Sequence, residues 1–250
     1  MRVIPVRTKR IEVGTDLDAI FEQSLPPLAD GSIVAVTSKV VSLAEGRVVE
    51  VGRADKHDLV RREADFYIRG EGKYDMMITI KRGILIPAAG IDESNGAGYY
   101  ILWPKNPQAS ANRIRRSLRR RSRRRRLGVI ITDSKTTPLR WGTTGTALAH
   151  SGFEALKNYI GTPDLFGRPM RVTQSNLLDG LAAAAVAVMG EGDEQTPLAV
   201  IEDVPFIKFQ DRDPSPKELR ALRISLENDL YAPILKRAAW TTRKRSTRRR

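Results

Sequence analysis

The chain has 250 residues, enough to bury a large core and an internal site in one or two domains. It has no cysteine, which excludes disulfides and thiolate chemistry, and its two histidines, His57 and His150, are too few for a histidine cluster, so any metal is expected to be held by oxygen ligands. No apolar run approaches the roughly 20 residues of a membrane span and no secretory signal is visible, so we expect a cytoplasmic protein with no membrane partner.

The formal net charge of +14 is concentrated in two short runs. Residues 113–126 hold ten arginines and no acid, and residues 243–250 hold six basic residues and no acid. The rest of the chain has 27 basic and 29 acidic residues and is therefore nearly neutral. Because residues 241–250 lack apolar side chains, they are predicted to be a disordered basic tail.

Residues 113–126 are predicted to form a surface helix, because Ala111, Ile114 and Leu118 recur at helical spacing. We interpret its arginines as a solvated face that lacks the usual acidic partners. The alternative is a nucleic-acid-binding protein that uses this helix and the tail. No aromatic residue interleaves the run for base stacking, which favours the first interpretation, so a nucleic-acid partner is not expected.

In chain order, the hydrophobic pattern predicts a mixed α/β fold. Strands are expected at residues 3–6, 33–36, within 44–51 after a Glu45-Gly46 turn, 76–80 and 84–87 as a hairpin, 99–103, 129–131 and 198–201. Helices are expected from Thr15, with Asp18 at capping-box spacing, at 56–67, 113–126 and 152–160, from an Asn176 cap to Met189, and from Ser215 with Pro216 at N1. The last helix is expected to carry Leu219, Leu222, Leu226 and Leu230 on one face, and residues 164–168 to form a tight turn. We predict a catalytic domain over 1–204, a helical extension over 205–240 and the tail.

Two predicted strands run directly into polar residues. The strand at 129–131 continues into Asp133 and Ser134, and the strand ending at Pro87 leads through small residues to Asp92 and Asn95. Ligands of α/β folds bind where strands end, and carboxylate oxygens suit Mg²⁺ or Mn²⁺. Asp92 and Asp133 are therefore expected to share a cation, although each could instead cap a turn, as in an Asx-turn at Asp92.

Two further polar stretches are candidates for phosphate contacts. Ser38 and Lys39 follow the strand at 33–36, where a plain polar turn is the alternative. Residues 190–197, which begin Gly-Glu-Gly after Met189, end the alanine-rich helix and could help to hold a metal-bound nucleotide, with a helix cap as the alternative. The Gly-Lys-Ser/Thr ending of a Walker A motif is absent from the whole chain.

Five sequence blocks together resemble the coenzyme F420-0:γ-glutamyl ligase family in order and separation. They lie at residues 37–47, 89–95, 129–134, 164–168 and 189–192, and the resemblance spans about residues 2–201. The chain looks most similar to a bacterial branch assigned to folate metabolism, through residues 91–96, 101–107 and 133–142.

The resemblance implies a mixed α/β fold and an intertwined homodimer. It also implies a GTP-dependent ligase that uses two Mn²⁺ or Mg²⁺ ions per site, with K⁺ considered as an additional cation. Such an enzyme joins L-glutamate to a carboxylate acceptor of deazaflavin or folate type through an acyl phosphate. The chemistry needs positioning and charge neutralisation rather than histidine or cysteine. A catalytically inactive relative is the remaining alternative.

The resemblance also assigns residues by position. Asp92 and Asp133 match metal ligands, Ser134 stands where a threonine ligates the second metal, and Gly190 lies in the loop that completes the site. The implied nucleotide contacts are Ser38, Lys39, Asn95, Met189, Gly190, Glu191 and Gly192. Arg140, as a catalytic candidate, and Lys135 are expected to contact glutamate or the acceptor. Leu43 replaces a nucleotide-contacting lysine of the deazaflavin enzymes, and Thr136-Thr137-Pro138 replaces their Gly-Arg-Pro.

Overall fold

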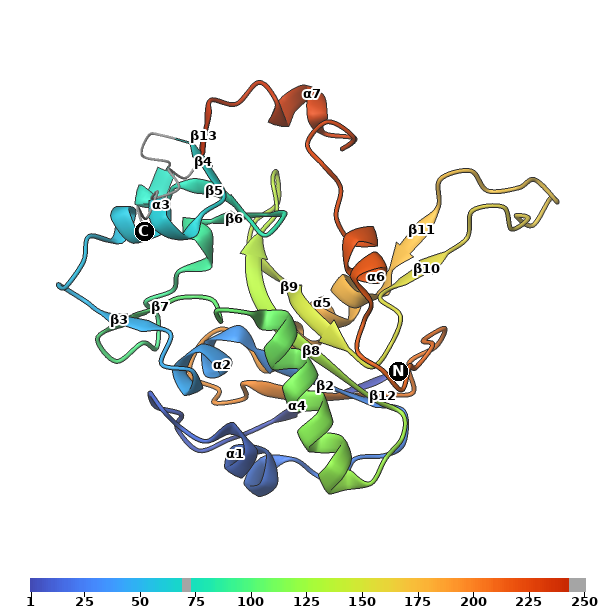
Figure 1. Ribbon diagram of the computed structural model, residues 1–250, viewed down its shortest axis with the longest axis horizontal. Coiled ribbons are helices and arrows are strands. Elements are labelled where there is room, and N and C mark those ends of the chain that lie inside the picture. The colour runs from blue at the N-terminus through green and yellow to red at the C-terminus, as the bar shows by residue number, and fades with distance from the viewer. Residues whose placement is uncertain (69–72, 243–250) are drawn as a thin grey trace, which may run out of the picture.

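A five-stranded mixed sheet forms the centre of the computed structural model, which describes residues 1–68 and 73–242 (Figure 1). The strands lie in the order β1 (Arg2–Val6), β12 (Leu198–Glu202), β2 (Ser32–Thr37), β8 (Leu127–Thr136) and β9 (Thr143–Ser151). Strands β2 and β8 pair in parallel, whereas the other neighbours are antiparallel. The predicted mixed α/β fold and its central strands are confirmed.

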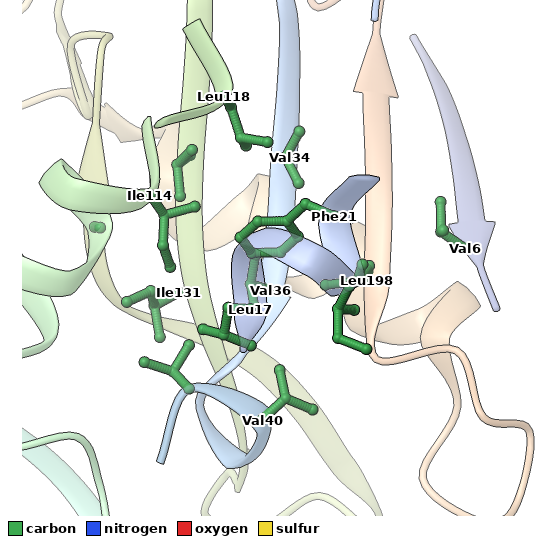
Figure 2. Close-up of a cluster of buried hydrophobic side chains, with 14 of the residues drawn as sticks. Val6, Leu17, Phe21, Val34, Val36, Val40, Ile114, Leu118, Ile131 and Leu198 are labelled. Carbon is green, nitrogen blue, oxygen red and sulfur yellow. The ribbon is translucent and has the colours of Figure 1, made fainter. Parts of the chain in front are cut away.

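Helices cover both faces of this sheet, so its central strands are apolar on both sides. On one face, Val34 and Val36 pack with residues of α1 (Leu17–Ser24), α2 (Ser38–Ala44) and α4 (Pro107–Ser122), as Figure 2 shows. On the other face, Ile33 and Ala35 pack against α5 (Leu177–Met189). The alternation of side chains along β2 thus joins two cores through one strand.

Local capping explains where the helices begin. The side chain of Asp16, not Thr15, caps α1 by accepting from the Asp18 N–H at 2.9 Å. The predicted Thr15 cap is wrong because the Thr15 hydroxyl instead accepts from the Glu12 N–H in the preceding turn. The predicted Asn176 cap of α5 is confirmed by its bond from the Asp179 N–H at 3.1 Å.

A smaller sheet lies beside the central one. It has the order β13 (Trp240–Thr242), β4 (Phe66–Ile68), β5 (Ile78–Lys81) and β6 (Ile84–Pro87). Around it lie α3 (Lys56–Glu63), η1 (Lys73–Asp75), η2 (Ala88–Gly90) and the pair β3 (Val48–Glu50) and β7 (Tyr99–Ile101). The helix predicted over 56–67 is too long, because the residues Phe-Tyr-Ile of β4 favour a strand and pair with β5 and β13.

A two-stranded arm of β10 (Leu156–Asn158) and β11 (Gln174–Asn176) extends away from the sheets (Figure 1). The helix predicted over 152–160 is therefore wrong. Tertiary pairing overrides the local pattern there: Glu154 donates its N–H to the Lys208 carbonyl, and the residues of β10 pair with β11. The predicted tight turn is confirmed by the bond from the Gly167 N–H to the Asp164 carbonyl at 3.1 Å.

The C-terminal segment contains α6 (Pro216–Ala221) and α7 (Ala232–Leu235) and returns to the smaller sheet through β13. The capping box of Ser215 and Glu218 is present, but α6 ends before Leu226 and Leu230, so the predicted long helix is wrong. Thr241 and Thr242 pair with β4, which corrects the predicted start of the disordered tail. Residues 243–250 of that tail lie outside the described residues.

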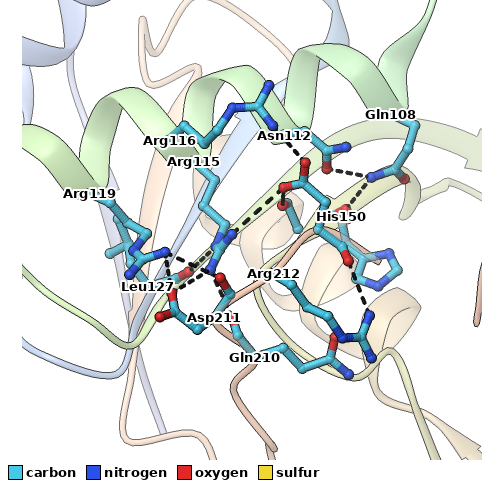
Figure 3. Close-up of polar contacts among 12 residues, drawn as sticks. Gln108, Asn112, Arg115, Arg116, Arg119, Leu127, His150, Gln210, Asp211 and Arg212 are labelled. Carbon is cyan, nitrogen blue, oxygen red and sulfur yellow. Dashed lines mark hydrogen bonds and ion pairs between the residues drawn. The ribbon is translucent and has the colours of Figure 1, made fainter. Parts of the chain in front are cut away.

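Four arginines of α4 have partners that are distant in sequence, and Figure 3 shows three of them, Arg115, Arg116 and Arg119. Arg115 is only 1% exposed and donates to the carbonyls of Leu127 and Gln210, at 3.0 and 2.7 Å. Further ion pairs join Arg116 to Asp213, Arg119 to Asp211 and Arg121 to Glu22. The interpretation as a solvated face without acidic partners is therefore wrong. The acids come from α1 and from residues 211–213, which follow β12, and this tertiary pairing leaves no local signal in the sequence.

We expect Arg115→Met to lower the free energy of unfolding by about 2–4 kcal/mol, because two carbonyls lose a charged donor inside the protein. Residues 205–222 should also become more sensitive to protease. Arg113→Met, on an exposed position of the same helix, is the matched control and should leave both properties unchanged. Chemical denaturation and limited proteolysis measure the two effects, and equal stability of both variants would contradict the proposed role of Arg115.

His150 should make stability depend on pH. Its ring is 1% exposed, its Nδ1 has no hydrogen-bond partner among the described residues, and burial lowers its pKa to about 4. Between pH 6.5 and 4 the imidazole is therefore protonated in the unfolded state but stays neutral in the folded state. About 3 kcal/mol of folding stability is lost as pH falls from 6.5 to 4. Denaturation curves of His150→Leu should lack this component, whereas those of His57→Leu should retain it. Identical pH profiles for His150→Leu and the wild type would contradict this.

Candidate active site

The parallel pairing of β2 and β8 brings two polar strand ends together. Thr37 of β2 lies opposite Thr132 of β8, and both strands point the same way. Lys39, in the first turn of α2, and Asp133 with Ser134, in β8, consequently leave the same edge of the sheet. This is the edge at which ligands bind in α/β folds.

A change of burial and a β-bulge mark the position of Asp133. Residues Leu127 to Thr132 of β8 are buried, Asp133 to Lys135 are half-buried, and Thr136 is exposed. The pairing of β8 with β9 shifts register between Ile131 and Thr132, an irregularity that re-aims the side chains after it. The Asp133 carboxylate Oδ2 accepts a hydrogen bond from Trp103 Nε1 at 2.5 Å. Burial raises the pKa of Asp133 to about 6 against the effect of this bond, and the nearby charge of Asp92 adds to the rise.

Asp92 reaches the same edge from a tight turn. The turn forms after β6, where Ala88 and Ala89 have φ values of 50° and 52°. Oδ1 of Asp92 accepts from the Ser94 N–H at 2.8 Å, which is an Asx-turn, while Oδ2 forms an ion pair with Lys39 Nζ at 2.8 Å. Burial works to raise the pKa of Asp92, but Lys39 and the Ser94 bonds outweigh it and hold that pKa below its usual value. Asp92 therefore does cap a turn, as the alternative interpretation expected, and it also lines the same cavity as Asp133.

The loop after α5 completes the edge. Gly190 ends the helix at φ 77°, and its missing side chain leaves room for the Glu194 carboxylate, which an added Cβ would approach to 2.4 Å. Ser134 Oγ donates to Glu191 at 3.1 Å, and Asn95 Nδ2 donates to the Gly192 carbonyl at 3.0 Å. The loop after α5 is thus hydrogen-bonded both to β8 and to the turn that holds Asp92 and Asn95.

These groups surround one cavity of about 640 Å³, which is in the usual range for a small-molecule site. Of the predicted site residues, the cavity is lined by Asp92, Asp133, Ser134, Lys39, Asn95, Met189, Gly190, Glu191 and Gly192. Ser38 is buried and lies outside the lining, and Arg140 lies on the exposed turn between β8 and β9, also outside it. Lys135, in β8, is also absent from the lining. The structure thus brings most of the predicted site together and leaves Ser38, Lys135 and Arg140 out.

Sequence reasoning missed one wall of the cavity. The unpredicted lining residues are 8–13, which follow β1, and Tyr99, whereas Asp193 and Glu194 belong to the predicted stretch 190–197. The segment 8–13 has no recognisable motif. Its only local signal is the charged pair Lys9-Arg10 directly after a strand, and the contact depends on β1 pairing with β12 at the sheet edge.

The donor set suits a hard cation beside phosphate. Asp92, Asp133, Ser134 and the backbone carbonyls of the 190–195 loop provide oxygen, which Mg²⁺ and Mn²⁺ prefer. Within residues 1–68 and 73–242, no three His, Asp or Glu side chains gather into a metal-binding group, so a cation here would need ligand or water oxygens as well. Lys39 Nζ forms an ion pair with Asp92 Oδ2 at 2.8 Å, so a cation bound at Asp92 would share this carboxylate with Lys39.

The sequence model of the family described as F420-0:Gamma-glutamyl ligase matches residues 5–203. The chain belongs to this family. A coenzyme F420:L-glutamate ligase of Methanopyrus kandleri is 33% identical, over 92% of this chain and 97% of that protein. Proteins of the same name from Methanocaldococcus jannaschii and Halobacterium salinarum are each 34% identical, over 75% and 85% of this chain and 82% and 89% of those proteins.

Membership in the F420-0:γ-glutamyl ligase family agrees with the mixed α/β fold. The family match ends just after β12 and includes every residue that lines the cavity. Leu43, where the sequence resemblance placed a lysine, lines the cavity. Among the described residues, no helix is long and apolar enough to span a membrane.

We expect Asp133→Asn to abolish metal-dependent turnover without unfolding this γ-glutamyl ligase family member. The change removes one carboxylate charge but keeps the size of the side chain and an oxygen that can accept the Trp103 bond. Because burial disfavours the Asp133 charge, the melting temperature at pH 7 should not fall. Activity and thermal melting are the measurements, and turnover equal to that of the wild type would contradict the site assignment.

Proposed function

We propose that this protein is a nucleotide-dependent γ-glutamyl ligase that forms an amide bond between L-glutamate and a carboxylate acceptor. One observation carries the proposal: Asp92, Asp133 and Lys39 line one cavity at the edge where the parallel pairing of β2 with β8 ends. Family membership and the names of its relatives support the same chemistry.

Joining an amine to a carboxylate in water requires an activated acyl group. In the proposed reaction the acceptor carboxylate attacks the γ-phosphorus of GTP, which gives an acyl phosphate and GDP. The glutamate amine then attacks the acyl carbon, phosphate leaves, and the amine gives up a proton. Each turnover consumes one GTP and releases one GDP and one phosphate, and catalysis consists largely of positioning and charge neutralisation.

Two divalent cations, Mn²⁺ or Mg²⁺, are part of the proposal. Asp92 and Asp133 would hold them, with the Ser134 hydroxyl and the Gly190 carbonyl as further oxygen donors. Bound there, the cations would neutralise negative charge on the transferred phosphoryl group. The protein's own part is to hold the carboxylates at the sheet edge, to place Lys39 beside them and to close the site with Asn95 and Glu191. A K⁺ ion would bind in the same oxygen-rich loops.

The acceptor is proposed to be a deazaflavin of the coenzyme F420 type or a folate. The relatives' name supports the first. Leu43 in the cavity wall and Thr136-Thr137 at the end of β8, in place of Gly-Arg, separate this chain from the deazaflavin enzymes and support testing the second. Lys135 and Arg140 stay candidates for an anionic acceptor that extends beyond the cavity along β8 and its turn.

A direct assay tests this proposal. Pure protein is incubated with Mn²⁺, L-glutamate, GTP or ATP, and a panel of deazaflavin phosphates and folates, with the Asp133→Asn variant as control. Mass spectrometry should show one acceptor heavier by a glutamyl unit, with GTP preferred and with stoichiometric GDP. Absence of product from every acceptor, together with no binding of nucleotide, would identify an inactive relative and contradict the proposal.

We also propose a homodimer, in which the β10–β11 arm packs against a second copy of the chain. The arm projects from the molecule and exposes large apolar side chains at and beside its tip: Leu165, Phe166 and Val172 are 100%, 89% and 84% exposed. Light scattering after size exclusion should give the dimer mass for the wild type and the monomer mass for Leu165→Asp with Phe166→Asp. Leu230→Asp, at an 85% exposed position of the C-terminal segment, is the control. A monomeric wild type would contradict the dimer.

A further inference from the structure

The carboxylate of Asp133 is held by a tryptophan that lies behind the cavity wall. Trp103 is 2% exposed, and its indole Nε1–H donates to Asp133 Oδ2 at 2.5 Å. An indole N–H can donate one hydrogen bond and accept none, so this contact needs an acceptor at Oδ2. Asp133 and Asp92 therefore differ in their anchors, since Lys39 brings a positive charge to Asp92 while Trp103 brings none to Asp133.

The indole ring is itself fixed by its surroundings. An added Cβ on Gly90 would lie 2.1 Å from Trp103 Nε1, so the ring packs directly against the backbone there, at a residue whose φ is 68°. Lys81 Nζ lies 4.9 Å from the ring centroid and forms an ion pair with Glu63 at 2.9 Å. The backbone at Gly90 and the cation of Lys81, in β5, therefore both restrict the position of the ring.

The backbone of Trp103 is also linked to Glu63, through Arg47. Arg47 Nε donates to the Trp103 carbonyl at 3.2 Å, and Arg47 also pairs with Glu63 at 2.6 Å. Glu63 thus supports Trp103 through two cations, with Lys81 over the ring and Arg47 on the main chain. Lys81 is buried, which makes this arrangement costly unless every charge in it is paired.

We propose that Trp103 is a positioning residue for Asp133, fixing the carboxylate with a neutral donor so that its full negative charge and remaining lone pairs face a divalent cation. The inference rests on the proposed function, which makes Asp133 a metal ligand. Groups that hydrogen-bond a metal-ligating side chain orient it, and their loss typically weakens metal binding by about 10–100-fold. A charged donor at Oδ2 would compete with the cation for the same carboxylate, and an indole does not.

Trp103→Phe separates this role from plain packing, because it keeps an aromatic ring under Lys81 and removes only the N–H and part of the ring. Calorimetric titration with Mn²⁺ in the presence of GTP should show affinity weakened by about 10–100-fold. Trp240→Phe is the matched control. Its indole donates to the Leu235 carbonyl at 2.6 Å on the C-terminal segment, and its loss should leave Mn²⁺ affinity unchanged.

Fluorescence provides a readout that packing alone does not move. In a variant with Trp141→Phe and Trp240→Phe, Trp103 is the single tryptophan. Mn²⁺ bound at Asp133 should quench its emission saturably, at the midpoint found by calorimetry, and Asp133→Asn should remove the quenching. Because the ring is buried, free Mn²⁺ in solution should quench it little.

The outcomes distinguish the two proposals. If the wild type binds neither Mn²⁺ nor GTP, the ligase proposal fails and the role of Trp103 fails with it. If the wild type binds both, two outcomes overturn only the role of Trp103. Either Trp103→Phe binds Mn²⁺ as tightly as the wild type does, or Trp240→Phe loses as much Mn²⁺ affinity as Trp103→Phe. Selective loss in Trp103→Phe with saturable quenching supports it.

Discussion

The parallel pairing of β2 with β8 is the constraint on which the rest of the structure depends. The paired segments of the two strands run the same way and end at the same edge, at Thr37 and Thr132. The residues that follow these segments, Lys39 and Asp133, therefore lie close together although they are far apart in sequence. The buried runs of both strands hold this register through two cores. The loop of Asp92 and the loop after α5 then close around that edge through Lys39, Asn95 and Glu191.

Charge is organised in the same way throughout the molecule, by partners that are remote in sequence. The arginines of α4 meet acids from α1 and from the segment after β12, and Glu63 meets Arg47 and Lys81. Because Arg115, Arg116 and Arg119 are occupied in this way, the basic helix serves to dock the C-terminal segment.

The strands of the central sheet and most of the cavity wall could be predicted, because apolar runs that end in acids and hydroxyls leave a local pattern. Residues whose state depends on distant partners could not be predicted. The segment at 152–160, predicted as a helix, contains β10, which pairs with β11. Phe66 and Tyr67, predicted as the end of the helix at 56–67, pair with β5. Likewise, residues 8–13 enter the cavity wall only because β1 pairs with β12, and Ser38 turns away into the core.

The central claim is that Asp92 and Asp133 act as one cation site rather than as two turn caps. Calorimetric Mn²⁺ titration of Asp92→Asn, Asp133→Asn and the double variant, with GTP present, tests it most directly. If the two carboxylates share the site, either change removes most of the affinity, and the double variant loses little more than the weaker-binding single variant. Losses that simply add, or Mn²⁺ binding that is unchanged in either single variant, would contradict the claim.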